Sequence, residues 1–295
     1  NAARFLEMNG CKPNPDFSSG DAKLALSRWI LDAANQAILA ATAALDAFRP
    51  DDYAKICYRF AWGDVCDWFV EFAKPGFAGP EAAEIRDVGG YILGVLLRLM
   101  HPLIPFVTEE LWTHFGYGPT ASLITAPWPE PALVSDAAAA REEVGWVVAL
   151  ISEIRTVRSE MNIPPSLKSP LLFKDASAET LARARRWEEA VGRMARVSDI
   201  APLTGDMPQG AVQIILGTVS LILPLAGIVD LAAERARLQV ARARAAAELA
   251  KVSQKLANQD FIIRAPEAIL NEHRDRQDGF TAEITRLDAA LQRIA

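Results

Sequence analysis

The chain has 295 residues, of which 51% are apolar and 23% are charged, and its formal net charge is −6. This length predicts two or three domains, and the apolar fraction is ample for a buried core, which argues against wholesale disorder. No uninterrupted apolar run reaches the roughly 18 residues of a transmembrane helix, so no membrane span is expected. The acidic balance excludes a simple basic coat for nucleic acid, but not a locally basic face.

Residue types that carry chemistry are sparse and scattered. The cysteines are too widely spaced for a disulfide framework or a metal knuckle, which favours a reducing, cytoplasmic environment: Cys11, Cys57 and Cys66. The histidines have no second ligand at metal-binding spacing: His101, His114 and His273. Phosphate-binding glycine motifs and a nucleophile elbow are absent. The sequence therefore predicts no catalytic residue, metal or cofactor in this chain.

The first 165 residues have the apolar periodicity of a helical bundle. Helices are expected at 21–48, 51–74, 80–100, 108–115 and 135–162. The second of these is apolar nearly all round, which predicts a central place in the bundle and a buried position for Trp62, Trp68 and Phe69. In the first helix, Trp29 lies about 150° from the centre of the apolar stripe, so it should face away from the bundle interior.

The pattern changes after residue 165. Short β-type runs at 171–173, 196–200, 212–216 and 219–223, with a helix at 178–191, predict a small β-α-β-β junction. Heptads then predict an antiparallel helical hairpin whose first arm is roughly 45 Å long and projects from the body. One register places Ile228, Leu249 and Leu256 at a, with Arg235 and Arg242 interrupting that series. It places four residues at d: Leu231, Leu238, Ala245 and Val252.

In the second arm the a positions are Leu270, Ile284 and Leu291, and the d positions are Phe280, Leu287 and Ile294. The expected fold is therefore mainly α, in three parts. A helical bundle spans 1–165, the junction spans 166–226 and the coiled-coil arm spans 227–295.

Several runs resemble the anticodon-binding helical domain of class I aminoacyl-tRNA synthetases, in the valyl, isoleucyl and leucyl branch. They are Asn1-Ala2-Ala3-Arg4-Phe5, residues 66–71 with Lys74, and residues 101–112. The hairpin is similar to the terminal coiled coil of the valyl branch, in residues 255–261, Arg264-Ala265-Pro266, and 223–225 leading into 230–234. The resemblance covers essentially the whole chain. The cysteine-rich zinc module typical of the isoleucyl branch is absent.

The resemblance implies an anticodon-binding and tRNA-binding segment, with tRNA(Val) and the N-terminal catalytic and editing domains of the same protein as partners. It implies a monomeric protein that does not bind a membrane. It also implies ATP and Mg²⁺ as cofactors, but only of the complete enzyme. The ATP-handling signatures are missing and the chain opens without Met, so we expect an inactive fragment of a longer protein. Two alternatives stay open: the tail of an isoleucyl or leucyl enzyme, and a non-enzymatic coiled-coil interaction protein.

Anticodon bases are splayed, and proteins read them by aromatic stacking and by hydrogen bonds to base edges. Because Trp29 is expected on the polar side of its helix beside Arg28, it is the predicted stacking residue, and Arg28 is a predicted anticodon contact. The alternative for Trp29 is that the 13–19 loop covers it. The resemblance adds Arg4 as an anticodon contact, for which the alternative is a surface ion pair.

Basic side chains elsewhere are candidates for the tRNA backbone. Arg155 and Arg158 share a helix face and could reach stem phosphates, or could pair with Glu153, Glu160 or other carboxylates. The first arm, 230–258, carries six basic residues against three acidic ones. A basic arm suits a phosphate backbone, although a charge run can also be a merely solvated face. The arm residues predicted for the tRNA backbone are Arg235, Arg237, Arg242, Arg244, Lys251 and Lys255.

Overall fold

A computed structural model describes residues 1–118, 122–225, 231–258, 261 and 266–293. The chain forms two compact units, 1–148 and 149–295, and each is described here by itself. Helices dominate, and a small four-stranded sheet lies in the second unit, which confirms the predicted mainly α class. Within the described residues, no helix has both the length and the apolarity required to cross a membrane.

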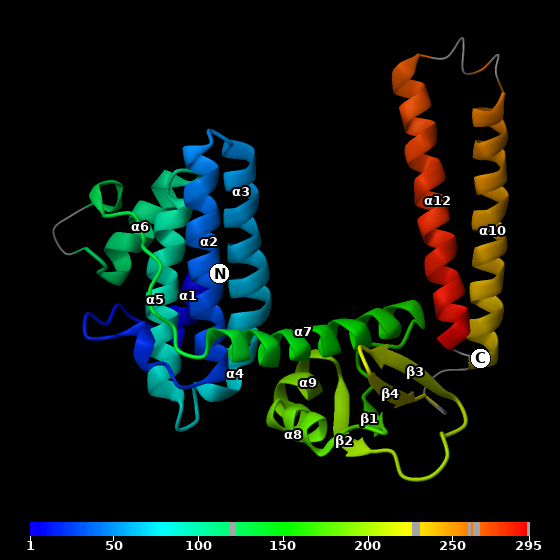
Figure 1. Ribbon diagram of the computed structural model, residues 1–295, viewed down its shortest axis with the longest axis horizontal. Helices are drawn as coiled ribbons and strands as arrows, with labels where there is room; N and C mark the ends of the chain where they lie inside the picture. Colours follow the sequence, from blue (N-terminus) through cyan, green and yellow to red (C-terminus); the bar gives the residue numbers. More distant parts are fainter. Residues whose placement is uncertain (119–121, 226–230, 259–260, 262–265, 294–295) are drawn as a thin grey trace. The chain divides into compact units, whose positions relative to one another are not determined.

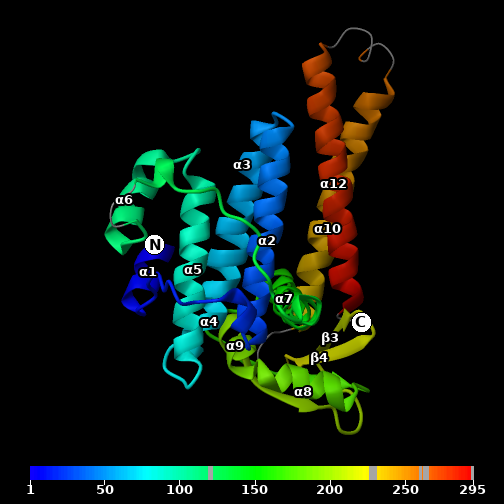
Figure 2. The ribbon, with the colours of Figure 1, turned by 60° about the vertical axis from the view of Figure 1, so that its left-hand side comes forward.

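The first unit is a bundle in which α2, α3 and α5 lie side by side (Figures 1 and 2). Proline occupies the first turn of α3 and of α6, where its missing N–H costs nothing. Pro105 is the first residue of α6. The helical elements are α1 (Ala2–Met8), η1 (Ser19–Asp21), α2 (Ala25–Asp46), α3 (Pro50–Tyr58), the π-helical segment η2 (Arg59–Phe69), α4 (Val70–Gly76), α5 (Ala82–Met100), α6 (Pro105–Phe115), η3 (Leu123–Thr125) and α7 (Ala137–Glu160), whose residues from 149 belong to the second unit.

The predicted central position of the second helix is wrong. The buried side chains of η2 and its neighbours recur every four or five residues, at Phe60, Val65 and Phe69 with Val70, because a π-helix bonds i to i+5. This winding shifts the inward face away from the one that an α-helical period predicts. Trp62 is therefore 58% exposed, against the prediction that it is core, whereas Phe69 is buried as predicted and Trp68 is half-buried.

The helix that is buried on several sides is α2. Its N-terminal half buries consecutive residues, from Trp29 to Asp32, while its far end is open, with Leu45 exposed and Phe48 just beyond it 92% exposed. Close backbone approach explains the glycines of α5. A Cβ on Gly90 would lie 2.0 Å from the carbonyl oxygen of Lys12, so only glycine allows the 11–12 segment to pack against this helix.

The second unit contains the predicted small sheet. Its strands, β1 (Ser169–Lys174), β2 (Val197–Pro202), β3 (Ala211–Leu216) and β4 (Val219–Pro224), lie in the order β2-β1-β4-β3. The β1–β2 pair is parallel and the other pairs are antiparallel, with Leu172 opposite Ile222. The crossover from β1 to β2 is helical, as parallel strands require, but it consists of two helices, α8 (Ala178–Arg186) and α9 (Glu188–Met194).

The hairpin consists of α10 (Leu231–Ala257) and α12 (Glu267–Arg293), which lie side by side in both views (Figures 1 and 2). Leu238, Ala245 and Val252 are buried, which confirms their d positions. Ile228, Ile294 and the side chain of Leu231 fall outside the described residues. Two inward positions of α12 are polar rather than apolar: His273 is buried, and the Gln277 amide donates to Ser253 Oγ at 2.9 Å.

Candidate nucleic-acid interface

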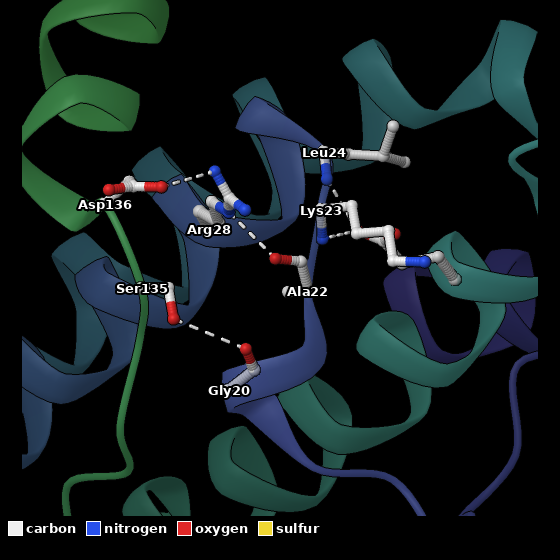
Figure 3. Close-up of polar contacts among 8 residues, drawn as sticks. Gly20, Ala22, Lys23, Leu24, Arg28, Ser135 and Asp136 are labelled. Carbon is white, nitrogen blue, oxygen red and sulfur yellow. Dashed lines mark hydrogen bonds and ion pairs between the residues drawn. The ribbon is translucent and has the colours of Figure 1, made fainter.

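Polar contacts hold the N-terminus of α2 between α5 and the segment that precedes α7 (Figure 3). Glu84 Oε1 accepts from the backbone N–H groups of Lys23 and Leu24 at 3.0 and 2.9 Å, which satisfies two donors at the start of the helix. Arg28 Nε donates to the Ala22 carbonyl at 2.8 Å, and its Nη1 lies 3.1 Å from Asp136 Oδ2. The Arg28 guanidinium is thus engaged within the protein.

The prediction that Trp29 faces away from the interior is wrong, because only 9% of the residue is exposed. Residues next to Trp29 on α2 contact a segment that belongs to neither α2 nor α5. Neighbouring Arg28 meets Asp136, Asp32 lies 3.3 Å from Arg141, and the Asn35 amide exchanges hydrogen bonds with the backbone of residue 132. The segment 132–141 therefore covers the side of α2 that a two-sided helical pattern assigns to solvent.

Arg4 is exposed and has no ion pair or hydrogen bond with the described residues, so its side chain is available to a ligand. The side chains of Lys12 and Lys23 are likewise exposed and without a partner among the described residues, and both residues lie between α1 and α2. That loop lies against α5, since Arg86 Nε donates to the Asn9 carbonyl at 2.9 Å. Sequence reasoning missed both lysines. The available signal was a cation at each end of a loop that joins two predicted binding elements.

Arg155 and Arg158 do not form the predicted pair of phosphate contacts. Arg158 is only 7% exposed, and its Nη2 donates to the carbonyls of Pro164 and Leu167 at 3.1 and 2.7 Å. Burial lowers the pKa of its guanidinium, and nearby Arg196 lowers it further. Arg155 Nε donates to the Met194 carbonyl at 2.9 Å. Both side chains thus donate to backbone carbonyls within the second unit, a kind of contact that the sequence did not predict.

The base of the hairpin is fastened to α7 by charged groups. Arg237 holds Glu234 with a two-pronged contact and donates from Nη2 to the Glu160 carbonyl at 3.0 Å. Arg293 forms an ion pair with the Glu160 carboxylate, and its other terminal nitrogen lies 4.0 Å from Glu153. Glu153 and Glu160, the carboxylates predicted as possible partners of Arg155 and Arg158, are therefore both close to Arg293.

The predicted arm cations differ in their freedom. Arg242 binds Asp288 of α12 through Nε at 2.5 Å, and Lys251 Nζ lies 2.6 Å from Glu248. Arg235, Arg244 and Lys255 are exposed and form no ion pair or hydrogen bond with the described residues. Half of the arm cations therefore have carboxylate partners within the chain, and the other half are available.

One side of the hairpin is hollowed along its length. Three consecutive hollows share Arg237 and Glu283, and then Glu248, at their junctions. Arg237, Arg244 and Lys251 recur every seven residues on this side, so they form a line with steps of about 10.5 Å. We name this side the basic groove. From the two hairpin helices it is lined by six cations and two carboxylates: Arg237, Arg244, Lys251, Lys255, Arg276, Arg286, Glu248 and Glu283.

Arg235 lies half a turn away from Arg244 on α10, on the side opposite to the line of cations. The contributions of α12 to the groove, Arg276 and Arg286, were missed because sequence reasoning counted basic residues on the first arm alone. With Leu270 at a, Arg276 falls at g, beside the inward positions of α12. Continuing the register along the second arm would therefore have identified Arg276 as a candidate.

No group of three or more His, Cys, Asp or Glu side chains that could hold a metal occurs in the described part of the chain. The three cysteines are free thiols. What the geometry offers to a ligand is the basic groove, together with a bundle end that carries available cations.

Comparison with known proteins identifies the two parts. Residues 27–173 match the family model of the anticodon-binding domain of tRNA ligase, and residues 230–295 match that of the valyl tRNA synthetase tRNA binding arm. The whole chain is 54% identical to a valine–tRNA ligase of Granulibacter bethesdensis, 52% to one of Gluconobacter oxydans and 40% to one of Agrobacterium fabrum. It covers 33%, 33% and 32% of their lengths, or about a third.

The two matched domains define the class as a tRNA-recognition segment of a tRNA ligase. Over its whole length the chain is similar to the C-terminal, tRNA-binding part of these valine–tRNA ligases. This confirms the resemblance seen in the sequence.

Proposed function

We propose that the chain provides tRNA(Val) recognition to a valine–tRNA ligase, with the first unit at the anticodon and the basic groove on the tRNA backbone. The observation that carries the groove assignment is the line of Arg237, Arg244 and Lys251 along one side of the hairpin. Phosphate contacts from such a line supply affinity without sequence information. The three predicted parts, 1–165, 166–226 and 227–295, stay the functional division that we propose.

For the anticodon we retain Arg4, which is exposed and has no partner among the described residues, and we assign Arg28 to positioning the start of α2. Trp29, being buried, supports the bundle around them. The exposed aromatic surface lies instead at Tyr58 and Trp62, which are 62% and 58% exposed and stack with ring centroids 6.1 Å apart and an interplanar angle of 3°. We propose this pair as the platform for an RNA base, since stacking requires a free ring face.

The relatives are ligases of about three times this length. We therefore assign the chemistry that uses valine, ATP and Mg²⁺, and any editing, to the remaining part of such an enzyme, and derive no step of it from these residues. A monomer in a reducing cytoplasm is the setting we propose, and the free thiols are consistent with it.

The test is a titration of the full chain with tRNA(Val) and with an anticodon-loop variant, over a range of salt concentrations. Arg244→Ala should weaken binding of both RNAs by the same factor and reduce the salt slope by about 0.7–0.9, the value for one phosphate contact. Arg235→Ala is the matched control, because it removes the same side chain from the opposite side of α10. Equal effects of the two variants would show that the groove is not the RNA-binding side.

A further inference from the structure

The distal hollow of the basic groove has the composition of a discrete anion site. It is a cavity of about 410 Å³, within the size range of small-ligand pockets. Lys251 and Lys255 line it from α10, and Arg276 lines it from α12. The side-chain amides of Gln254 and Asn258 add neutral donors. Three cations from two helices thus surround one concavity.

His273 is the unusual member of this lining. It occupies an inward heptad position of α12, only 9% of it is exposed, and the edge of its ring meets Phe261 with centroids 5.4 Å apart. Its Nδ1 is sealed from solvent and has no hydrogen-bond partner among the described residues. An apolar residue at this position would avoid the desolvation cost of an unsatisfied buried group. A buried polar group without a partner calls for an explanation.

The surroundings of the two ring nitrogens explain why a histidine can occupy this position. With a proton on Nε2, the imidazole would leave only a lone pair in the dry interior, and Nε2 could donate to a ligand in the cavity that His273 lines. Nε2 is the ring nitrogen that is not sealed, and it has no hydrogen-bond partner in the described part of the chain. His273 therefore combines a ring buried in the hairpin with a nitrogen that can donate to an anion held by the three cations of the same cavity.

The single carboxylate in the lining does not cancel them. Glu248 is bound by Lys251 at 2.6 Å, and its pKa lies below the ordinary value because of that hydrogen bond first, with the charges of Lys251, Arg276 and Arg244 adding to it. One cation is matched by Glu248, which leaves Lys255 and Arg276 without an ion pair to the described residues. The cavity keeps an excess of positive charge in a chain whose net charge is −6.

We propose that this cavity binds one phosphate group between Lys255, Arg276 and the Nε2–H of His273, with Lys251 at its rim. The chemistry is that of any phosphate oxyanion. The assignment of this anion to a phosphate of the tRNA backbone rests on the function proposed above. The distal hollow would then hold one backbone phosphate at a defined position along the basic groove. The remaining cations of the line then contact the backbone through longer and more mobile side chains.

Histidine-selective ¹⁵N labelling of the full chain gives a direct readout, since it holds only three histidines. Titration with inorganic phosphate, against sodium chloride at equal ionic strength, should shift the His273 ring signals saturably and leave those of His101 and His114 unchanged. Lys255→Ala or Arg276→Ala should weaken this response about fivefold, the effect of one exposed charge contact. Arg274→Ala removes a neighbouring arginine that does not line the cavity, and should leave the response intact.

Titration with tRNA(Val) separates the sources of phosphate. A His273 shift with both ligands supports the proposal, whereas a shift with inorganic phosphate alone overturns the assignment to RNA. No shift with either ligand overturns the site itself, and the salt slopes of Arg244→Ala then decide independently whether the groove binds RNA. His273→Leu should stabilise the hairpin and yet weaken tRNA binding about fivefold. Unchanged tRNA binding in that variant would reduce His273 to a packing residue.

Discussion

Two tryptophans of the first unit allow a matched test of which aromatic ring supports the fold and which is free. Trp29 is only 9% exposed, whereas Trp62 is 58% exposed. Trp29→Ala should lower the free energy of unfolding by about 3–5 kcal/mol, the range for truncation of a core tryptophan. At about 2–4 °C per kcal/mol for a unit of this size, the melting temperature should fall by roughly 6–20 °C.

Trp62→Ala removes the same side chain from the surface and is the control. It loses its stacking on Tyr58, worth about 0.5–1.5 kcal/mol, and little burial. Its melting temperature should therefore change far less than that of Trp29→Ala. If the exposed pair is the platform for an RNA base, Trp62→Ala should cost about 1–3 kcal/mol of tRNA binding.

Calorimetry on the full chain measures the melting temperature of each variant. Fluorescence anisotropy with labelled tRNA, recorded below the melting temperatures of both variants, measures tRNA binding. Trp29→Ala should bind tRNA normally while it is folded, and Trp62→Ala should melt normally but bind weakly. A Trp29→Ala protein that melts like the wild type and binds tRNA poorly would contradict the burial of Trp29 and restore it as the stacking residue.

Two further predictions concern buried groups. Arg158→Ala should destabilise the second unit by about 1–3 kcal/mol for each backbone carbonyl left unpaired, measured by urea unfolding; a loss of tRNA affinity at unchanged stability would instead make it a ligand contact. Burial raises the pKa of all three thiols, that of Cys11 to about 12, and only Cys66 is partly exposed. Because the thiolate is the reactive form, a maleimide at pH 8 should label Cys66 first in the native protein, and Cys11 and Cys57 only on unfolding; prompt labelling of Cys11 would contradict its burial.

The sequence errors in the first unit share a physical origin. The prediction of buried faces assumed that every residue turns the helix by the same angle. It also assumed that only one face of each helix is covered by the rest of the protein. The π-helical winding of η2 breaks the first assumption and turns Trp62 outward. The segment 132–141 breaks the second assumption by covering the polar side of α2 from more than ninety residues away. Neither the winding nor the long-range cover leaves a local signal, so Trp29 could not be placed from its own helix.

The hairpin was easier to predict because its heptads are local and repeat. Leu238, Ala245 and Val252 are buried where the register places them. The same reliance on apolar residues explains the omissions: His273 and Gln277 continue the inward series of α12, but as polar side chains they do not appear in an apolar count. The strands of the small sheet were likewise predictable, since each is a short β-type run between turns.

The acidity of the chain and the proposed role of the groove follow one electrostatic logic. A polyanion is repelled by a body of net charge −6 everywhere except where cations gather without partners. Counting basic residues cannot locate that place, because Arg242 is bound to Asp288 and Arg158 to backbone carbonyls, while Arg244 and Lys255 have no ion pair or hydrogen bond with the described residues. Of the α10 cations without a partner among the described residues, Arg244 and Lys255 line the basic groove, which Arg276 and Arg286 of α12 also line, whereas Arg235 lies on the opposite side. Since phosphate contacts add affinity equally for every tRNA, we expect groove variants to change the strength of binding but not the choice of tRNA, and we expect that choice to depend on contacts outside the groove.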